Sequence, residues 1–141
     1  GSVITPDGKT LIVGETLAAR LTAFDIESDG SLSHRRAWAV FDDLGLRTRR
    51  SEIINRVTPD GICLDAEGAV WVASPNTRAL IRVREGGEIT HRFQLEHTPF
   101  ACMLGGPDRM TLFVLTSSMY ENDAVGRIET IQVDIPGAGL P

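Results

Sequence analysis

A strand-and-turn motif that occurs three times is the feature that most restricts how this chain of 141 residues can fold. Each copy is a short apolar run followed by a turn rich in Asp, Gly and Pro, and the copies begin at Val3, Ile62 and Cys102. Copies separated by roughly 40 to 60 residues are typical of repeat proteins in which each repeat is one small sheet. Such a sheet cannot bury both faces by itself, so the motif predicts an all-β chain whose units cover one another.

The second copy is the most complete. Pro59 and Gly61 place Asp60 in a tight bend, and residues 62–73 then give a strand, a turn and a second strand. An Asp at the mouth of a strand either stabilises the turn with its own carboxylate or, on a rigid scaffold, serves as a metal ligand or a base. Spacing alone favours the turn role.

Segments of alternating apolar and polar residues divide the chain into three units. The units cover residues 3–41, 58–95 and 99–134 and contain four, four and three expected strands. The last strand of the first unit is expected over residues 36–41, and the first strand of the third unit over residues 101–104. Residues 42–56 interrupt this rhythm and are expected to form an inserted loop or short helix, with residues 51–54 docked on a pocket rim. The last unit lacks an outer strand, because the two prolines and two glycines of residues 134–141 prevent the chain from extending a ladder.

A family signature is carried by three stretches: TPDGICLDAEGAVWVA at residues 58–73, RALIRV at residues 78–83 and LGGPDRMTLFV at residues 104–114. Together they resemble the senescence marker protein/gluconolactonase (regucalcin-like) family, and the resemblance runs nearly from end to end of the chain. Two features depart from the family: a longer insertion at residues 42–56, and Leu104 where Phe is often found. These departures suggest a bacterial subgroup with its own substrate.

The resemblance implies the C-terminal half of a six-bladed β-propeller, since family members are about twice as long as this chain. It implies two four-stranded blades and three strands of a third, whose outer strand comes from the N-terminal part of the ring. Such an arc exposes a sheet edge and apolar faces to water. We therefore expect a partner, either the N-terminal half as a separate polypeptide or a second copy of this chain.

The resemblance also implies one divalent cation at the mouth of the central channel, held by oxygen atoms of a Glu, an Asn and the Asp of a Pro-Asp-Gly turn. Of these ligands the Asp alone has a counterpart here, and it is Asp60. Oxygen ligands suit Ca²⁺, Mg²⁺, Mn²⁺ or a catalytic Zn²⁺, so the identity of the ion stays open. A cation of this kind polarises a lactone carbonyl and lowers the pKa of bound water, while Asp60 acts as ligand or base.

The activity that the resemblance implies is that of a metal-dependent hydrolase of the lactonase or esterase type, acting on a small cyclic ester such as a sugar lactone. Two other functions stay open at this point. One is a propeller that binds Ca²⁺ or a small ligand without turnover, and the other is a scaffold for protein contacts.

Candidate substrate contacts lie on the same side of the units as Asp60. The loops between the second and third strands of each unit offer Glu15, Asn76 and Tyr120. Phe100 stands in the third unit where Asp60 stands in the second, so it is expected to give the pocket an apolar wall. Asp7 also belongs to a Pro-Asp-Gly, but it lies at the opposite rim and is expected to serve its turn alone.

Composition excludes several other classes of protein. A net charge of −5 argues against a nucleic-acid partner, which needs clustered basic residues, and the basic run at residues 47–50 is expected to be a solvated loop. No apolar run approaches the roughly 20 residues of a membrane-spanning helix, so no membrane partner is expected. Hydrophobic residues at 42% and charged residues at 23% indicate an ordinary globular chain.

The two cysteines, Cys63 and Cys102, each lie within an apolar run. This predicts buried free thiols in a reducing cytoplasm rather than a disulfide or a metal-binding pair. The three histidines, His34, His91 and His97, are expected to be exposed and to form no catalytic group. Nucleophile elbows, Cys-x-x-Cys pairs and phosphate-binding loops are absent from the sequence.

Overall fold

The computed structural model of this chain describes residues 1–41, 56–118 and 125–139. Several predictions fall outside these residues: the inserted loop or helix over residues 42–55, including its docking at residues 51–54, the solvated basic run at residues 47–50, and the substrate contact of Tyr120.

Eleven strands form three antiparallel sheets in the described residues, which confirms the all-β prediction. Sheet 1 contains β1 (Ser2–Ile4), β2 (Thr10–Glu15), β3 (Arg20–Ile26) and β4 (Leu32–Val40). Sheet 2 contains β5 (Ile62–Leu64), β6 (Val70–Ser74), β7 (Ala79–Val83) and β8 (Ile89–Gln94), and sheet 3 contains β9 (Thr98–Gly105), β10 (Thr111–Ser117) and β11 (Gly126–Gln132). A 3₁₀ turn, η1 (Thr16–Ala18), joins β2 to β3.

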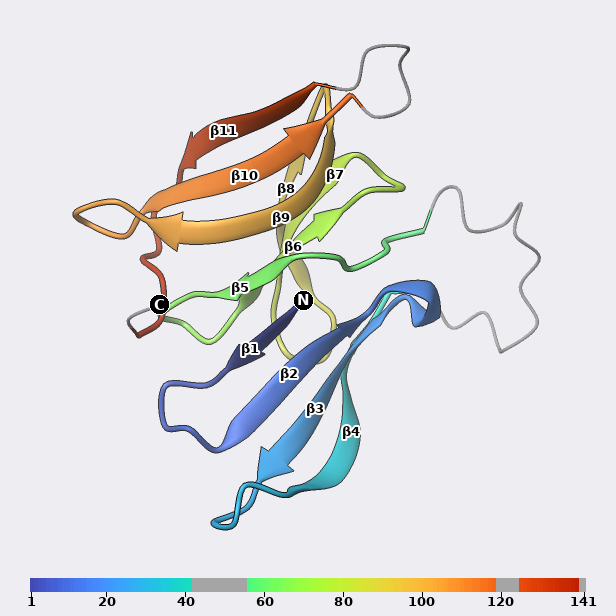
Figure 1. The fold of residues 1–141 in the computed structure, drawn as a ribbon, viewed down its shortest axis with the longest axis vertical. Coiled ribbons are helices and arrows are strands. Elements are labelled where there is room, and N and C mark those ends of the chain that lie inside the picture. The colour runs from blue at the N-terminus through green and yellow to red at the C-terminus, as the bar shows by residue number, and fades with distance from the viewer. Residues whose placement is uncertain (42–55, 119–124, 140–141) are drawn as a thin grey trace.

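Each sheet is a meander, because every strand pairs with its neighbour in sequence. The three sheets follow one another along an arc in which β1, β5 and β9 are the first strands (Figure 1). This is the arrangement of consecutive blades in a partial β-propeller.

Most predicted strands agree with the observed ones to within two residues, and two strands are longer than predicted. Strand β4 begins at Leu32 rather than at residue 36, because β3 and β4 stay paired past two bulges as far as Ile26 and Leu32. Strand β9 begins at Thr98 rather than at residue 101, because Thr98 pairs with Ser117 beyond a bulge at Phe100. The sequence pattern does not reveal a bulge, because a bulge adds one residue to a strand while the pairing with the next strand continues on both sides of it.

The hydrophobic core lies between neighbouring sheets, and the residues of β6 illustrate this. All five of its residues are buried. Val70 and Val72 pack into the core shared with sheet 1, whereas Trp71 and Ala73 pack into the core shared with sheet 3. Side chains alternate between the two faces of a strand, so a strand covered on both faces reads as a continuous apolar run.

The first strands of sheets 2 and 3 approach each other so closely that a side chain does not fit between them. A Cβ atom built on Gly61 would lie 2.4 Å from the Cα of Ala101, below the 3.0 Å that real Cβ contacts respect. Gly1 is equally close to sheet 2, since its Cβ would lie 2.7 Å from the Asp60 carbonyl oxygen. Small residues therefore set the spacing of the inner strands.

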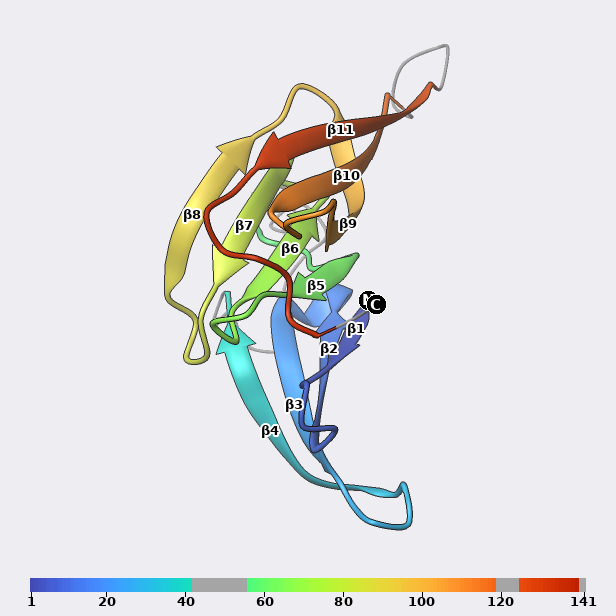
Figure 2. The same ribbon diagram turned by 90° about the vertical axis from the view of Figure 1, so that its left-hand side faces the viewer.

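The C-terminal segment turns back under the first strands instead of extending sheet 3 (Figure 2). The Ala66 N–H donates to the Pro136 carbonyl at 2.8 Å, and the Ala138 N–H donates to the Leu64 carbonyl at 3.0 Å. The prediction that this segment adds no strand to the third unit agrees with β11 ending at Gln132. Its attachment to sheet 2 was not predicted.

One face of sheet 3 has no covering layer within the described residues. Met103, Phe113, Leu115 and Ile128 share this face by register, and Ile128 has 70% of its surface exposed. The opposite face carries Leu112, which is fully buried against sheet 2. The open face of sheet 3 is therefore apolar, like a face that packs against a neighbouring sheet.

A cavity of about 420 Å³ lies where the ends of β1, β5 and β9 meet the C-terminal segment. Its lining includes Ile4, Leu64, Leu104 and Ala138. Asp60 lies two residues before β5, at the end of that strand farther from the cavity, and is not among the residues that line it. In the described part of the chain, no helix is long and apolar enough to cross a membrane.

Candidate functional site

The segment that leads into β5 is fixed by hydrogen bonds from two directions. The Thr58 N–H donates to the hydroxyl of Ser74 in sheet 2 at 3.1 Å. The hydroxyl of Thr16, from η1 of sheet 1, donates to the Pro59 carbonyl at 2.8 Å. Both bonds come from loops or strand ends at the same end of the molecule, so this segment is tied to two sheets at once.

The next two residues are fixed in the same way. The Asp60 N–H donates to the Ala73 carbonyl at 3.0 Å, whereas the Gly61 N–H turns away and donates to the Phe100 carbonyl of sheet 3 at 2.8 Å. The Ala73 N–H in turn donates to the Gly61 carbonyl at 2.9 Å. Asp60 and Gly61 therefore share one partner residue on β6, as in a β-bulge, and the backbone that carries the Asp60 side chain is rigid.

The side chain of Asp60 is half-buried and makes no hydrogen bond or ion pair with any residue that the structure describes. A partly buried carboxylate without a partner retains its capacity to accept bonds or to ligate a hard cation. Because the backbone of Asp60 is fixed, holding its side chain in position costs little conformational entropy. The Asp60 carboxylate thus fits the role of one oxygen ligand.

The described residues contain no cluster of three or more His, Cys, Asp or Glu side chains that could hold a metal ion. Asp60 offers one ligand, whereas Ca²⁺ or Mg²⁺ takes six or more oxygen ligands, some of them water. Asp60 is thus one ligand of the several that a divalent cation at this place would need.

Glu15, a predicted substrate contact, is engaged within its own sheet. Its carboxylate accepts hydrogen bonds from Arg20 at 2.7 Å, from Arg35 at 2.9 Å and from the Thr22 hydroxyl. The bond from Arg20, assisted by Thr22 and Arg35, lowers the pKa of Glu15 to about 2 despite partial burial. These bonds give Glu15 a structural role in sheet 1, and its contact with a substrate stays a prediction.

Asn76 lies in the turn between β6 and β7, at the same end as Asp60, and is exposed. Its N–H donates to the Thr58 hydroxyl at 3.4 Å. The turn that carries Asn76 is therefore attached to the segment that carries Asp60. The structure brings these two predicted site residues to neighbouring segments.

Phe100 occupies the bulge of β9, where it has no cross-strand partner, and its side chain is half-buried. Its carbonyl accepts the Gly61 N–H, so Phe100 and Asp60 lie on adjacent segments of sheets 3 and 2. An apolar wall next to Asp60 is compatible with this placement and stays a prediction.

The prediction that His97 is exposed is wrong. Its side chain is 18% exposed, and its Nδ1 lies 3.3 Å from the Glu129 carboxylate, which also accepts the Thr116 hydroxyl at 2.6 Å. His97 joins β8 to β9, and Glu129 faces it from β11 of the neighbouring sheet. His97 and Glu129 are 32 positions apart in the sequence, so local patterns do not reveal this pair.

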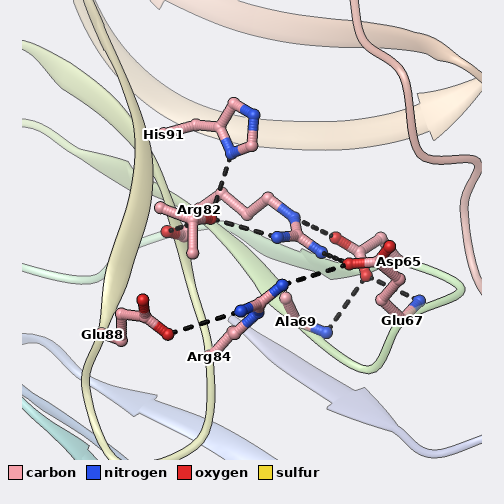
Figure 3. Close-up of polar contacts among 8 residues, drawn as sticks. Asp65, Glu67, Ala69, Arg82, Arg84, Glu88 and His91 are labelled. Carbon is pink, nitrogen blue, oxygen red and sulfur yellow. Dashed lines mark hydrogen bonds and ion pairs between the residues drawn. The ribbon is translucent and has the colours of Figure 1, made fainter.

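A second charged group missed from the sequence lies inside sheet 2 (Figure 3). Asp65 is fully buried and accepts the Nε–H of Arg82, which is 1% exposed, at 2.6 Å. The other guanidinium nitrogens donate to Glu67 at 2.9 Å and to Thr90 at 3.1 Å. Burial opposes the charge on Arg82, but its bonds to Asp65 and Glu67 outweigh burial and raise the pKa of Arg82. Asp65 is thus a structural counter-ion at the end of β5 away from Asp60.

The two cysteines are buried free thiols, as predicted, and they lie together. The Sγ atoms of Cys63 on β5 and Cys102 on β9 are 3.8 Å apart. The hydrogen bond to Cys63, together with burial, raises the pKa of Cys102 well above its ordinary value. The pair therefore packs as a neutral contact between the inner strands.

Comparison with known proteins adds a finding that the geometry alone does not give. Residues 1–118 match the model of a family described as the SMP-30/Gluconolactonase/LRE-like region. Regucalcin of Xenopus laevis is 30% identical over 116 residues, which are 79% of this chain and 34% of that protein. The chain thus spans about a third of the length of the curated relatives that it matches.

Two solved structures have a similar fold. A calcium-binding protein, regucalcin, from Agrobacterium tumefaciens is 21% identical, with a TM-score of 0.66 over 99% of this chain and 49% of that one. A gluconolactonase from Xanthomonas campestris is 26% identical, with a TM-score of 0.62 over 82% of this chain and 34% of that one. The arc of three sheets therefore corresponds to part of a larger fold in both proteins.

Proposed function

Because this chain belongs to the SMP-30/gluconolactonase/LRE-like family, we propose that it is part of a lactonase-type hydrolase and contributes Asp60 to a divalent-cation site. The substrate class that we propose is a small cyclic ester such as a sugar lactone. The name of the Xanthomonas campestris relative, a gluconolactonase, supports this choice.

One observation of the structure carries the assignment of Asp60. Its backbone is held by bonds to β6, and its neighbours are held by sheets 1 and 3, yet its carboxylate has no partner among the described residues. A carboxylate on a rigid backbone, left without a partner among the described residues, suits a preorganised ligand site.

A bound divalent cation would polarise the ester carbonyl and make a bound water more acidic. The contribution of this chain is to hold an anionic oxygen at a fixed place, as a ligand or as the base that takes a proton from that water. Asn76 and Phe100, on the segments next to Asp60, are proposed to contact the substrate, as are Glu15 and Tyr120. Calcium is supported as the ion by the name of the Agrobacterium tumefaciens relative, and Zn²⁺, Mg²⁺ and Mn²⁺ are the other candidates.

The test compares Asp60→Asn with Asp7→Asn in the full-length protein. Both residues stand in a Pro-Asp-Gly, but Asp7 bonds its own turn at the opposite rim, so Asp7→Asn is a matched control. We expect Asp60→Asn to weaken Ca²⁺ binding in calorimetric titration by at least about tenfold and to abolish hydrolysis of a sugar-lactone panel, because a carboxylate ligand contributes charge that an amide lacks.

Asp7→Asn should leave both properties unchanged. Wild-type cation affinity and hydrolysis in Asp60→Asn, with a native circular dichroism spectrum, would show that Asp60 is only a turn residue.

A non-catalytic cation-binding protein is the second candidate function, favoured by the name of the Agrobacterium tumefaciens relative. It shares the Asp60 site and differs in the absence of turnover. Cation binding that is lost in Asp60→Asn, without hydrolysis of any lactone by the wild-type protein, would support this alternative.

We further propose that the rest of the ring supplies the missing ligands and covers the open faces. The described residues offer no ligand cluster, and the face of sheet 3 that carries Ile128 is bare. The remainder of the same propeller, as a separate chain or as part of the same one, is the partner that we favour over a second copy. A cytoplasmic location remains our expectation from the two free thiols.

A further inference from the structure

The hydroxyl of Ser74 is a buried junction at the site end of sheet 2. Ser74 ends β6 and has no exposed surface. Its Oγ accepts the Thr58 N–H at 3.1 Å and lies 2.7 Å from the Thr77 hydroxyl, which donates to it. One buried atom thus joins the segment before β5 to the turn after β6.

One further bond makes this junction continuous with the candidate site. The Asn76 N–H donates to the Thr58 hydroxyl at 3.4 Å, so the turn and the segment are tied twice. Thr58 is itself buried, and Asp60 follows it by two residues. The segment with Asp60 and the turn with Asn76 should therefore move together.

The register of the three sheets shows which side chains in sheets 1 and 3 occupy the position of Ser74. Val13, Val72 and Val114 are equivalent, because they pair with the first-strand residues Ser2, Ile62 and Cys102. Two residues further on, the equivalent side chains are Glu15, Ser74 and Thr116.

In sheets 1 and 3 this side chain bonds to the third strand of its own sheet. Glu15 accepts the Thr22 hydroxyl, and the Thr116 hydroxyl donates to Glu129. Ser74 instead bonds to the segment before the first strand, and that is the segment with Asp60.

We propose that Ser74 is the positioning residue of the site, holding the Asp60 carboxylate at the distance that a divalent cation requires. This inference rests on the proposed function of Asp60. Without the Ser74 hydroxyl, the buried Thr58 N–H would lose its acceptor, and the segment would shift to find another. Displacement of a ligand weakens the site even when the fold survives.

The test uses Ser74→Ala in the full-length protein, with Ca²⁺ as the probe in calorimetric titration. We expect the Kd for Ca²⁺ to rise about tenfold or more, and kcat for lactone hydrolysis at saturating Ca²⁺ to fall while KM changes little. Ser74→Thr should restore both, since it retains the hydroxyl and threonine occupies the equivalent place in sheet 3.

Thr116→Val is the matched control, because it removes a hydroxyl bond at the equivalent position away from Asp60. It should lower Tm by an amount similar to that in Ser74→Ala and leave the Kd for Ca²⁺ unchanged. A purely structural role for Ser74 predicts the same behaviour for both variants, and that result would overturn the proposal.

Comparison of Ser74→Ala with Asp60→Asn distinguishes failure of the positioning role from failure of the proposed function. Wild-type Ca²⁺ affinity in Ser74→Ala alongside weakened affinity in Asp60→Asn overturns the positioning role and leaves the proposed function intact. Unchanged affinity in both variants overturns both. If Ser74→Ala does not fold, Thr77→Val decides: it removes one bond to the same hydroxyl and should raise the Kd about threefold, and an unchanged Kd would contradict the proposal.

Discussion

Two aspartates in the same tripeptide have different environments in this structure. The Asp7 carboxylate accepts the Thr5 hydroxyl at 2.6 Å and the Lys9 N–H at 3.1 Å, so it closes its own turn. The Asp60 carboxylate makes no such bond within the described residues, and the N–H groups of Asp60 and Gly61 donate to the carbonyls of Ala73 and Phe100. The same tripeptide therefore closes its own turn at Asp7 and leaves the carboxylate without a partner in the described residues at Asp60.

The Glu15 ion pairs give the first residue-level prediction, on pH. The folded pKa of Glu15 is about 2 and its unfolded value is 4.5, so its stabilisation is fully present above pH 4.5 and is lost as pH falls toward 2. Because its arginine partners are partly exposed, we expect a loss of about 1–2 kcal/mol between pH 6 and pH 2.5. Urea denaturation of the full-length protein at several pH values measures it.

Glu15→Gln is the control for this prediction. It cannot ionise, so its stability should fall less over the same range, with the difference equal to the Glu15 contribution. If the free energy of unfolding changes with pH in the same way in both proteins, the ion pairs of Glu15 contribute nothing to stability.

The thiol pair gives the second residue-level prediction. Both thiols are buried and shielded from reagents, and the raised pKa of Cys102 further disfavours its reactive thiolate. We expect Cys63 and Cys102 to be labelled by an aromatic disulfide reagent at least about a hundredfold more slowly in the native protein than in urea. Rapid labelling of either thiol without denaturant would mean that β5 and β9 separate readily.

At the scale of the strand, the close contact between β5 and β9 predicts that substitution of Gly61 destabilises the protein strongly. In Gly61→Ala the new Cβ would lie 2.4 Å from the backbone of Ala101, so one strand must move. Overpacking of this kind costs about 1–3 kcal/mol or more, and we expect a matching fall in the free energy of unfolding. Since Asp60 precedes Gly61, Ca²⁺ binding should weaken as well.

Gly126→Ala is the matched substitution. Gly126 is the first residue of β11, as Gly61 is the residue directly before β5, and its added Cβ would meet nothing within 4 Å. We expect its stability to change by less than about 0.5 kcal/mol or to rise slightly, since alanine restricts the unfolded chain. Equal effects of the two substitutions would contradict the tight contact between β5 and β9.

At the scale of the whole molecule, the open face of sheet 3 predicts where further structure lies. Ile128 is exposed here on a face that carries Met103 and Leu115. If the rest of the ring covers this face, Ile128→Glu in the full-length protein should cost about 2 kcal/mol or more, because a charge would be buried in place of an apolar side chain.

Ile89→Glu is the control, because Ile89 is an exposed apolar residue of β8, the outer strand of the sheet between the other two. Its effect should stay within about 0.5 kcal/mol. Similar small effects of both substitutions would mean that the face of sheet 3 is exposed in the full-length protein too.

The sequence was sufficient for the architecture because the signals are local. Alternating side chains and turn residues predicted the three meanders and all but two strand starts, and the family signature placed Asp60 at the mouth of β5. Bulges lengthened β4 and β9 beyond what periodicity predicts.

By itself, then, the sequence determined the kind of fold, its repeats and which carboxylate to consider, since each depends on residues near one another along the chain. Only the tertiary structure decided how that carboxylate is held. The bond from Thr58 to Ser74 spans 16 positions, that from Thr16 to Pro59 spans 43, and the contact between the thiols spans 39. Such partners are chosen by how the sheets pack, because a hydrogen bond requires that two groups meet in space, and no local pattern records that meeting.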